Sequence, residues 1–376
     1  MDLLQVVSAG ISAPTFQSVN ILAAVLSYCV ISTLAIPGPY FLGAPLKDNR
    51  PRVTYVLNGL RAHILAMILY IVGSDYCLNL YKATIIYDNY GPLLTTTVLW
   101  AFLFSAFLYL RAKFVIPKVD QNYQSDNFLV NFWCGVELNP HVLGFEVKCW
   151  SYRPGFILMS LINISVLAKQ LELYHSVSTP MIMFQAISLF YVVDAFYFET
   201  GLVYMFDIIE ENFGLMLIFG DYTWIPFVFS LQSLYLVKPT TVSTPYIILN
   251  VIVLLVGYWI FRGSNYQKLQ FRLNPNKPIN GKAPEVIKTG RPGRDLLISG
   301  WWGRARKINY TGDILIAIAM SMPCPLYVLA YLYPIYLTIL LFNRAQRDDH
   351  RCREKHQQYW TEYCKRVPYI LVPGVY

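Results

Sequence analysis

Residues 245–262 read PYIILNVIVLLVGYWIFR, a run of apolar and aromatic side chains with no charge before Arg262. A helix that crosses the hydrocarbon core of a bilayer needs roughly 20 such residues, so this run is predicted to span a membrane. The composition agrees, because 56% of the 376 residues are apolar and only 14% are charged. Soluble domains carry about 25% charged residues. We therefore expect an all-α fold, a polytopic bundle of membrane helices.

Further apolar runs lie on both sides of this stretch. They cover residues 19–36, 58–74, 92–111, 154–170, 179–198, 213–237 and 313–342. The last run contains the sequence MPCP at 322–325, and its prolines are expected to divide the run into two helices. The sequence thus predicts about 8–10 transmembrane helices in one integral membrane domain, residues 1–376.

Basic residues follow the opening stretch at once. Residues 262–307 hold eleven Lys or Arg against two acids, and seven further basic residues follow residue 342. Positively charged loops of membrane proteins stay on the cytosolic side, so both regions are predicted to face the cytosol. The same rule accounts for the net charge of +8, and no nucleic-acid partner is expected. The basic residues of the loop are Arg262, Lys268, Arg272, Lys277, Lys282, Lys288, Arg291, Arg294, Arg304, Arg306 and Lys307.

The sequence disfavours a disulfide framework, a metal site and a signal peptide. The seven cysteines are scattered without a CxxC pair, which disfavours a disulfide framework or a zinc site. The five histidines show no HExxH spacing, so no bound metal is expected. Residues 1–20 lack a basic start and a cleavage site, so the first span is expected to direct membrane insertion.

Several ionisable side chains lie inside or beside the apolar runs. A charge at the centre of a membrane helix costs roughly 2.5 kcal/mol or more, so these groups are expected to face a cavity or a partner. The alternative is a carboxylate that caps or pairs helices. Because burial raises the pKa of a carboxyl group, buried acids and nearby tyrosines suit proton donation. The candidate proton donors are Glu199, Asp221, Tyr235 and Asp313.

The basic loop also carries a pattern suited to phosphate. Lys268 and Arg272 are four residues apart, so on a helix they share one face. Such a pair binds phosphate or pyrophosphate well, and the alternative is a solvated positive face. Trp302, Asn309 and Tyr310 could form the walls and hydrogen-bond partners of a planar ligand, or belong to an interfacial aromatic belt. The chain has no GxGxxG and no P-loop, which excludes a Rossmann or Walker nucleotide site.

Three long motifs in the C-terminal half of the chain resemble those of the NADPH-dependent sterol reductases. They are FRGSNYQKLQFRLNPNKP at 261–278, LLISGWWGRARKINYTGD at 296–313 and RDDHRCREKHQQYWTEYCKRVPYILVPGVY at 347–376. The likeness extends upstream through VLNGLRA, GVELNP, the RPG at 153–155 and FGDYTWIPFVFSLQSLYLV. This family includes the sterol C14-, C7- and C24-reductases and the membrane half of the lamin B receptor.

The resemblance implies reduction of a sterol carbon–carbon double bond with NADPH, by protonation of the alkene and then hydride transfer. The motifs favour C14 as the position reduced, followed by C7 and then C24. The N-terminal half, 1–240, would hold the sterol cavity, and the C-terminal half, 241–376, would hold NADPH in a cytosolic-side pocket. The implied partners are a sterol within the bilayer and membrane lipid. The membrane would be that of the endoplasmic reticulum in a eukaryote and the inner membrane in a bacterium.

The family's cofactor positions can be transferred residue by residue. They fall on Lys268, Arg272, Leu297, Trp302, Asn309, Tyr310, Asp348, Cys352, His356 and Tyr363. The chain departs from the family in two places. It reads Lys355-His356-Gln357 where the family usually has Lys-Tyr-Gly, and Arg306-Lys307 where many members have Arg-His.

Two alternatives to the reductase remain at this point. Membrane methyltransferases of the isoprenylcysteine and phospholipid type share part of the C-terminal pattern and would bind S-adenosylmethionine, but they are shorter and lack the Lys268–Arg272 pair. The second alternative is a non-catalytic, sterol-binding membrane scaffold. Dependence on NADPH or on S-adenosylmethionine distinguishes the two enzyme classes.

Overall fold

The computed structural model describes residues 12–44, 52–118, 121–123, 125–142, 144–279, 281–290, 295–325 and 327–376. These residues fold into two compact units, Met1–Thr240 and Thr241–Tyr376. Arg291 and Arg294 of the basic loop lie outside the described residues, as do residues 1–11 of the N-terminal stretch.

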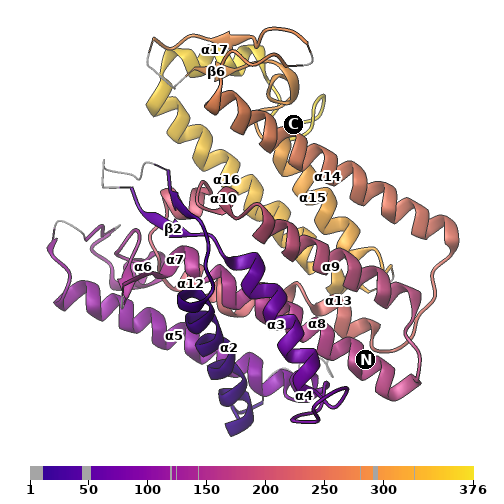
Figure 1. Cartoon of the computed structure of the whole chain (residues 1–376). Helices are drawn as coiled ribbons and strands as arrows, with labels where there is room; N and C mark the ends of the chain where they lie inside the picture. The colour runs from indigo at the N-terminus through magenta and orange to yellow at the C-terminus, as the bar shows by residue number, and fades with distance from the viewer. Residues whose placement is uncertain are drawn as a thin grey trace. The chain divides into compact units, whose positions relative to one another are not determined.

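The N-terminal unit is built almost entirely of helices, coloured indigo to pink in Figure 1. Its longer helices are α2 (Phe16–Ala35), α3 (Gly59–Gly73), α5 (Tyr90–Phe114), α8 (Tyr152–Tyr174) and α9 (Thr179–Tyr197). Its shorter helices are α4 (Ile85–Asp88), α6 (Phe128–Cys134), α7 (Val147–Trp150), α10 (Glu199–Leu202), α11 (Phe206–Ile209), α12 (Leu215–Phe219), the π-helix η3 (Gly220–Val228) and α13 (Leu231–Leu236). Two small antiparallel hairpins pair β1 (Tyr40–Leu42) with β2 (Thr54–Val56), and β3 (His141–Val142) with β4 (Phe145–Glu146).

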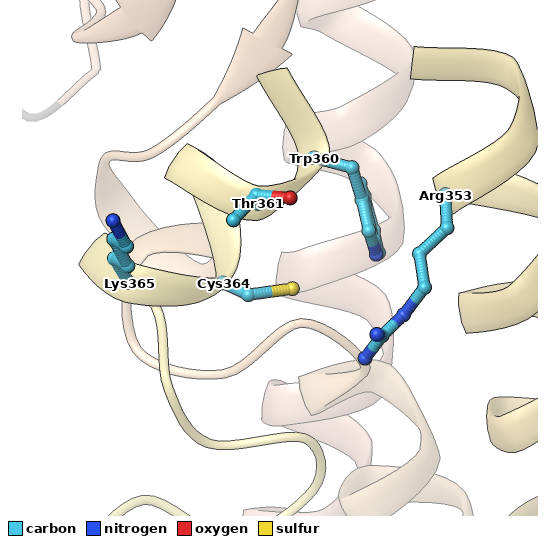
Figure 2. A pocket seen from close by; sticks show the side chains of 5 residues that line it. All are labelled: Arg353, Trp360, Thr361, Cys364 and Lys365. Carbon is cyan, nitrogen blue, oxygen red and sulfur yellow. The ribbon is translucent and has the colours of Figure 1, made fainter. Parts of the chain in front are cut away.

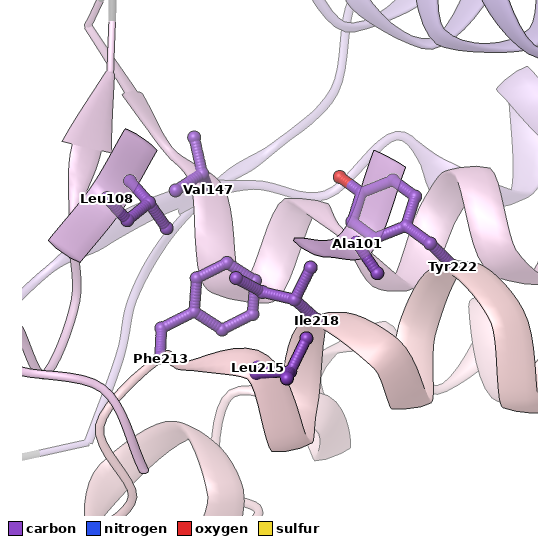
Figure 3. Close-up of a cluster of buried hydrophobic side chains, with 7 residues drawn as sticks. All are labelled: Ala101, Leu108, Val147, Phe213, Leu215, Ile218 and Tyr222. Carbon is purple, nitrogen blue, oxygen red and sulfur yellow. The ribbon is translucent and has the colours of Figure 1, made fainter. Parts of the chain in front are cut away.

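Helix α8 is the central element of this unit. Most of its residues are buried, which is expected of a helix that other helices surround on all sides. Beside it, α5, α7, α12, η3 and the segment just before α12 contribute the residues of an apolar core, which Figure 3 shows converging. The core residues are Ala101, Leu108, Val147, Phe213, Leu215, Ile218 and Tyr222.

The C-terminal unit, orange to yellow in Figure 1, contains two long helices, several shorter ones and a short hairpin. Its elements are α14 (Thr244–Leu273), β5 (Val286–Ile287), β6 (Leu296–Leu297), the 3-10 helix η4 (Gly300–Gly303), α15 (Ile308–Ser321), the 3-10 helix η5 (Val328–Tyr331), α16 (Leu332–His356) and α17 (Gln358–Arg366). The predicted break at MPCP is confirmed, because α15 ends just before it and α16 begins after it.

Helices α14 and α15 cross closely at two glycines. A Cβ atom on Gly312 would lie 2.5 Å from the backbone nitrogen of Phe261, and one on Gly257 would lie 2.8 Å from Cβ of Leu315. Small residues allow membrane helices to approach in this way. The crossing fixes the start of α15, which carries Asn309 and Tyr310, against the second half of α14.

The apolar stretch 245–262 forms the first half of α14, and many of its large side chains are exposed, among them Ile248, Ile252 and Leu255. An exposed apolar helix surface of this length suits lipid. Within the described residues, seven helices are long and apolar enough to cross a membrane, and α3 and α15 are shorter apolar helices. The prediction of an all-α, multi-pass membrane protein is confirmed.

Candidate functional site

Trp302 lies where three segments of the C-terminal unit meet. Its indole Nε1 donates a hydrogen bond of 2.9 Å to the carbonyl of Ser264 on α14. The Nζ of Lys268, one turn further along α14, lies 3.9 Å from the centre of the Trp302 ring, a cation–π geometry. The hydroxyl of Tyr363 on α17 donates to the Trp302 carbonyl at 3.2 Å. Three predicted cofactor residues, far apart in sequence, are therefore in contact.

Asp348 on α16 is the acidic group of this region. Its buried carboxylate accepts a hydrogen bond from the ammonium of Lys307 and lies 3.2 Å from the guanidinium of Arg351. The thiol of Cys352, one turn later, donates to the same carboxylate at 3.8 Å. Helical spacing explains the contacts of Asp348 with Arg351 and Cys352. The contact with Lys307 is long-range and joins α16 to the segment before α15.

Asn309 and Tyr310 lie in the first turn of α15. The side-chain nitrogen of Asn309 donates to Oδ1 of Asn265 on α14 at 3.4 Å. Its own Oδ1 is buried and has no hydrogen-bond partner among the described residues. A buried carbonyl oxygen is costly to leave unpaired, so this atom is available to a donor on a ligand. Tyr310 turns its ring to within 5.9 Å of the Lys307 ammonium.

The remaining predicted cofactor residues have different surroundings. Arg272 is exposed, one turn beyond Lys268 on α14, and Leu297 is buried in β6. His356 ends α16, and its ring lies 6.4 Å from that of Trp360. The ring of Trp360 in turn lies 5.0 Å from that of Tyr363, with an angle of 33° between the ring planes. Arg272 lies within electrostatic range of Lys268, and His356 is linked to the group around Trp302 through Trp360.

The segment that carries Lys307 is fixed by its backbone. The amides of Arg306 and Lys307 donate to the carbonyls of Tyr369 and Ile370 at 3.0 and 2.7 Å. The Arg306 guanidinium also pairs with Asp349 at 2.9 Å. Sequence reasoning treated both basic residues as ordinary members of a positive loop, because their partners lie more than 40 positions away. Only their departure from the family pattern drew attention to Lys307.

A shallow pocket of about 260 Å³ lies on another side of α17 (Figure 2). The Cys364 thiol points between Trp360 and Arg353 in this view. None of the ten predicted cofactor residues lines this pocket, whose lining residues are Arg353, Trp360, Thr361, Cys364 and Lys365.

Glu199, at the start of α10, is held by two partners in the N-terminal unit. Its carboxylate pairs with Arg153 at 3.1 Å and accepts the backbone amide of Gly59 at 3.0 Å. Both side chains of the ion pair are buried, with exposed fractions of 7% and 9%. The motifs VLNGLRA and RPG meet at this carboxylate. The arrangement matches the helix-capping and helix-pairing alternative, in which the charge is fully compensated.

Asp221 lies in the π-helix η3 and is buried. Asp207, Glu146 and Lys148 lie within electrostatic range of it, and the Lys148 ammonium donates to the carbonyls of Ile208 and Glu211 at 2.7 and 2.9 Å. The backbone of Asp221 packs against Gly155, where a Cβ atom would collide with the Asp221 carbonyl. Short π-helical segments are frequent at functional sites.

The other two donor candidates lie in different units. Tyr235 is half-buried on α13 in the N-terminal unit. Asp313 lies on α15 in the C-terminal unit, one turn after Asn309, and the cations that act on it are Arg344 and Arg262. Of the four candidates, the structure therefore places three in the N-terminal unit and one beside the cofactor residues.

The fold and these residues define a class: a multi-pass membrane protein with a basic, aromatic cluster in its C-terminal unit and buried carboxyl groups in its N-terminal unit. The chain belongs to the ergosterol biosynthesis ERG4/ERG24 family, whose sequence pattern matches residues 4–376. This membership confirms the resemblance read from the three C-terminal motifs.

Individual relatives are similar over most of their length. The chain is 37% identical to a Delta(14)-sterol reductase of Arabidopsis thaliana over 371 residues, which cover 98% of each protein. It is 39% identical to a Delta(14)-sterol reductase of Dictyostelium discoideum, over 90% of this chain and 74% of the relative. It is 40% identical to a Delta(14)-sterol reductase of Mus musculus, over 89% of this chain and 79% of the relative.

Proposed function

We propose that the protein reduces a carbon–carbon double bond of a sterol with NADPH, and that the Δ14 bond is the one reduced. Family membership and the relatives named Delta(14)-sterol reductase support the reaction class. The observation that carries the proposal is the contact of Lys268, Trp302 and Tyr363 in one unit. C7 and C24 remain second and third choices for the position of the bond.

The charge of the C-terminal site supports NADPH as the cofactor. Lys268, Lys307 and Arg351 lie around the carboxylate of Asp348, and Arg272 lies within electrostatic range of Lys268. A pyrophosphate carries two negative charges, and a phosphate monoester such as the 2′-phosphate adds about −1.5 to −2. The excess of cations therefore suits the phosphorylated dinucleotide.

Two further features fit a dinucleotide. Lys268 and Arg272 would bind its phosphates, and the unpaired Oδ1 of Asn309 would accept a hydrogen bond from an amide or a hydroxyl group. When bound, NADPH supplies the hydride. The residues of the chain would hold it, orient it and keep water from the reacting atoms.

The proton must come from the protein or from water that the protein holds. One alkene carbon gains this proton, the resulting carbocation gains the hydride, and the product carries two more hydrogens than the substrate. We propose Asp221 as the first candidate donor, because it is buried and the carboxyl groups of Asp207 and Glu146 lie within its electrostatic range, and interacting carboxyls can retain a proton. Glu199 is the weaker candidate, since Arg153 and Gly59 already engage its carboxylate.

Incubation of membranes that contain the protein tests the proposal. Sterols unsaturated at C14, C7 or C24 are supplied separately, each with NADPH or with S-adenosylmethionine, and products are measured by mass spectrometry. We expect a gain of two hydrogens on the C14-unsaturated sterol with NADPH only. A methylated product would support the methyltransferase alternative. Binding of sterols without any product would support the non-catalytic scaffold.

A further inference from the structure

Asp348 poses an electrostatic problem for the proposed cofactor site. A carboxylate close to bound phosphates repels them, and inside a protein this repulsion is screened far less than in water. Yet Lys268, one of the cations that would bind the phosphates, lies within the electrostatic range of Asp348. Something must compensate its charge before a polyanion can bind.

Lys307 is placed to compensate it. The ammonium of Lys307 contacts the Asp348 carboxylate, and the exposed fractions of the two side chains are only 13% and 11%. Arg351 approaches the other carboxylate oxygen at 3.2 Å but is more exposed, at 32%. Lys307 therefore makes the closer and better-buried contact with the carboxylate.

The backbone and the charges keep Lys307 in this position. Its amide donates to the Ile370 carbonyl at 2.7 Å, which fixes the backbone from which the side chain reaches Asp348. Burial lowers the pKa of the Lys307 ammonium, but the acidic groups around it, Asp348 first, raise it by more, and the pKa stays above its ordinary value. Lys307 is therefore charged at neutral pH.

We propose that Lys307 is a specificity-determining residue of the cofactor site. It neutralises Asp348, so that this carboxylate can accept hydrogen bonds from a cofactor hydroxyl or amide without repelling the 2′-phosphate. The inference rests on the proposed function, because it concerns how the same site distinguishes NADPH from NADH. Lys307 acts through Asp348 and is a positioning residue.

The test compares dissociation constants for NADPH and NADH in the purified full-length protein. Lys307→Met exposes the charge of Asp348, and we expect it to raise the Kd for NADPH about 10-fold or more and that for NADH several times less. Asp348→Asn removes an acceptor and should raise the Kd for NADH, while the freed positive charge of Lys307 should make the rise for NADPH smaller. In the double variant Lys307→Met/Asp348→Asn, no charge is left unpaired, and the ratio of the two Kd values should return to within about twofold of wild type.

Two controls keep the result interpretable. Lys307→Arg retains the positive charge and should retain the wild-type ratio. Lys282→Met removes an exposed lysine of the same loop and should leave both Kd values unchanged. If Lys307→Met fails to fold, Lys307→Gln replaces it, because the amide can still donate a hydrogen bond to the buried Asp348 carboxylate but does not neutralise its charge, and the same selective rise in the Kd for NADPH is expected.

Several outcomes would overturn the inference. An unchanged ratio in Lys307→Met would show that Lys307 has no part in specificity. A double variant that keeps the loss seen in Lys307→Met would show that Lys307 contacts phosphate directly and does not act through Asp348. A wild-type protein that binds neither dinucleotide would refute the proposed function itself. A wild-type preference for NADPH that Lys268→Ala weakens, but Lys307→Met does not, would refute this inference alone.

Discussion

Lys268 is the residue on which the cofactor site depends most. Its ammonium rests on the Trp302 ring at 3.9 Å, so the lysine and the indole face are positioned together. A charge-assisted hydrogen bond contributes about 1.5–3 kcal/mol, which corresponds to roughly 10- to 100-fold in affinity. We expect Lys268→Ala to weaken NADPH binding by that factor, measured by titration of the purified protein. Lys282→Ala is the matched control, and an unchanged affinity in Lys268→Ala would remove Lys268 from the site.

The two buried acids of the N-terminal unit should respond differently to neutralisation. Glu199→Gln leaves Arg153 without its counter-charge, which costs about 3–5 kcal/mol for a buried pair, so a lower melting temperature is expected.

Asp221→Asn should instead lower turnover by about 10²- to 10⁴-fold, as the loss of a general acid does, while the Kd for NADPH stays the same. Thermal unfolding and single-turnover kinetics separate the two effects. Normal turnover in Asp221→Asn would exclude this residue as the donor.

At the scale of elements, the crossing of α14 and α15 positions the cofactor residues of both helices. A side chain at Gly312 would meet the backbone of Phe261 at 2.5 Å, and overpacking of this kind costs about 1–3 kcal/mol. We expect Gly312→Ala to push the helices apart, with a lower melting temperature and weaker NADPH binding, because Asn309 and Tyr310 begin the same helix. Gly201→Ala is the control, since a Cβ atom there meets nothing within 4 Å. Equal behaviour of the two variants would contradict this account.

The helices show how much of the fold can be predicted from the sequence. The apolar runs predicted most of the long helices, because membrane spans require length and hydrophobicity, and both are local properties. Helix α14 nevertheless continues past the apolar run to Leu273, since backbone hydrogen bonding does not stop where the side chains become polar. The π-helix Gly220–Val228 was not predicted, because its hydrogen-bond register depends on packing against α8. The pairing of Lys307 with Asp348 was also missed, since residues 41 positions apart leave no periodic signal.

At the scale of the whole molecule, the proposed reaction draws its two hydrogens from different sources. The hydride comes from the dihydronicotinamide, and the proton comes from a carboxyl group that exchanges with water. A reaction in D₂O with unlabelled NADPH should therefore give a sterol with one deuterium. NADPH deuterated at C4 of the nicotinamide, in ordinary water, should give one deuterium on the neighbouring carbon. Mass spectrometry counts the deuterium, and nuclear magnetic resonance assigns its position.

The labelling pattern also tests which residue donates the proton and which residue binds the cofactor. If Asp221 donates the proton, Asp221→Asn should slow incorporation from both sources equally, because the hydride follows protonation of the alkene. In Lys268→Ala, by contrast, cofactor binding is weakened, so turnover should recover as the NADPH concentration rises. Two deuterium atoms from solvent, or none, would contradict protonation followed by hydride transfer. Recovery of Asp221→Asn at high NADPH would place Asp221 in cofactor binding and not in proton donation.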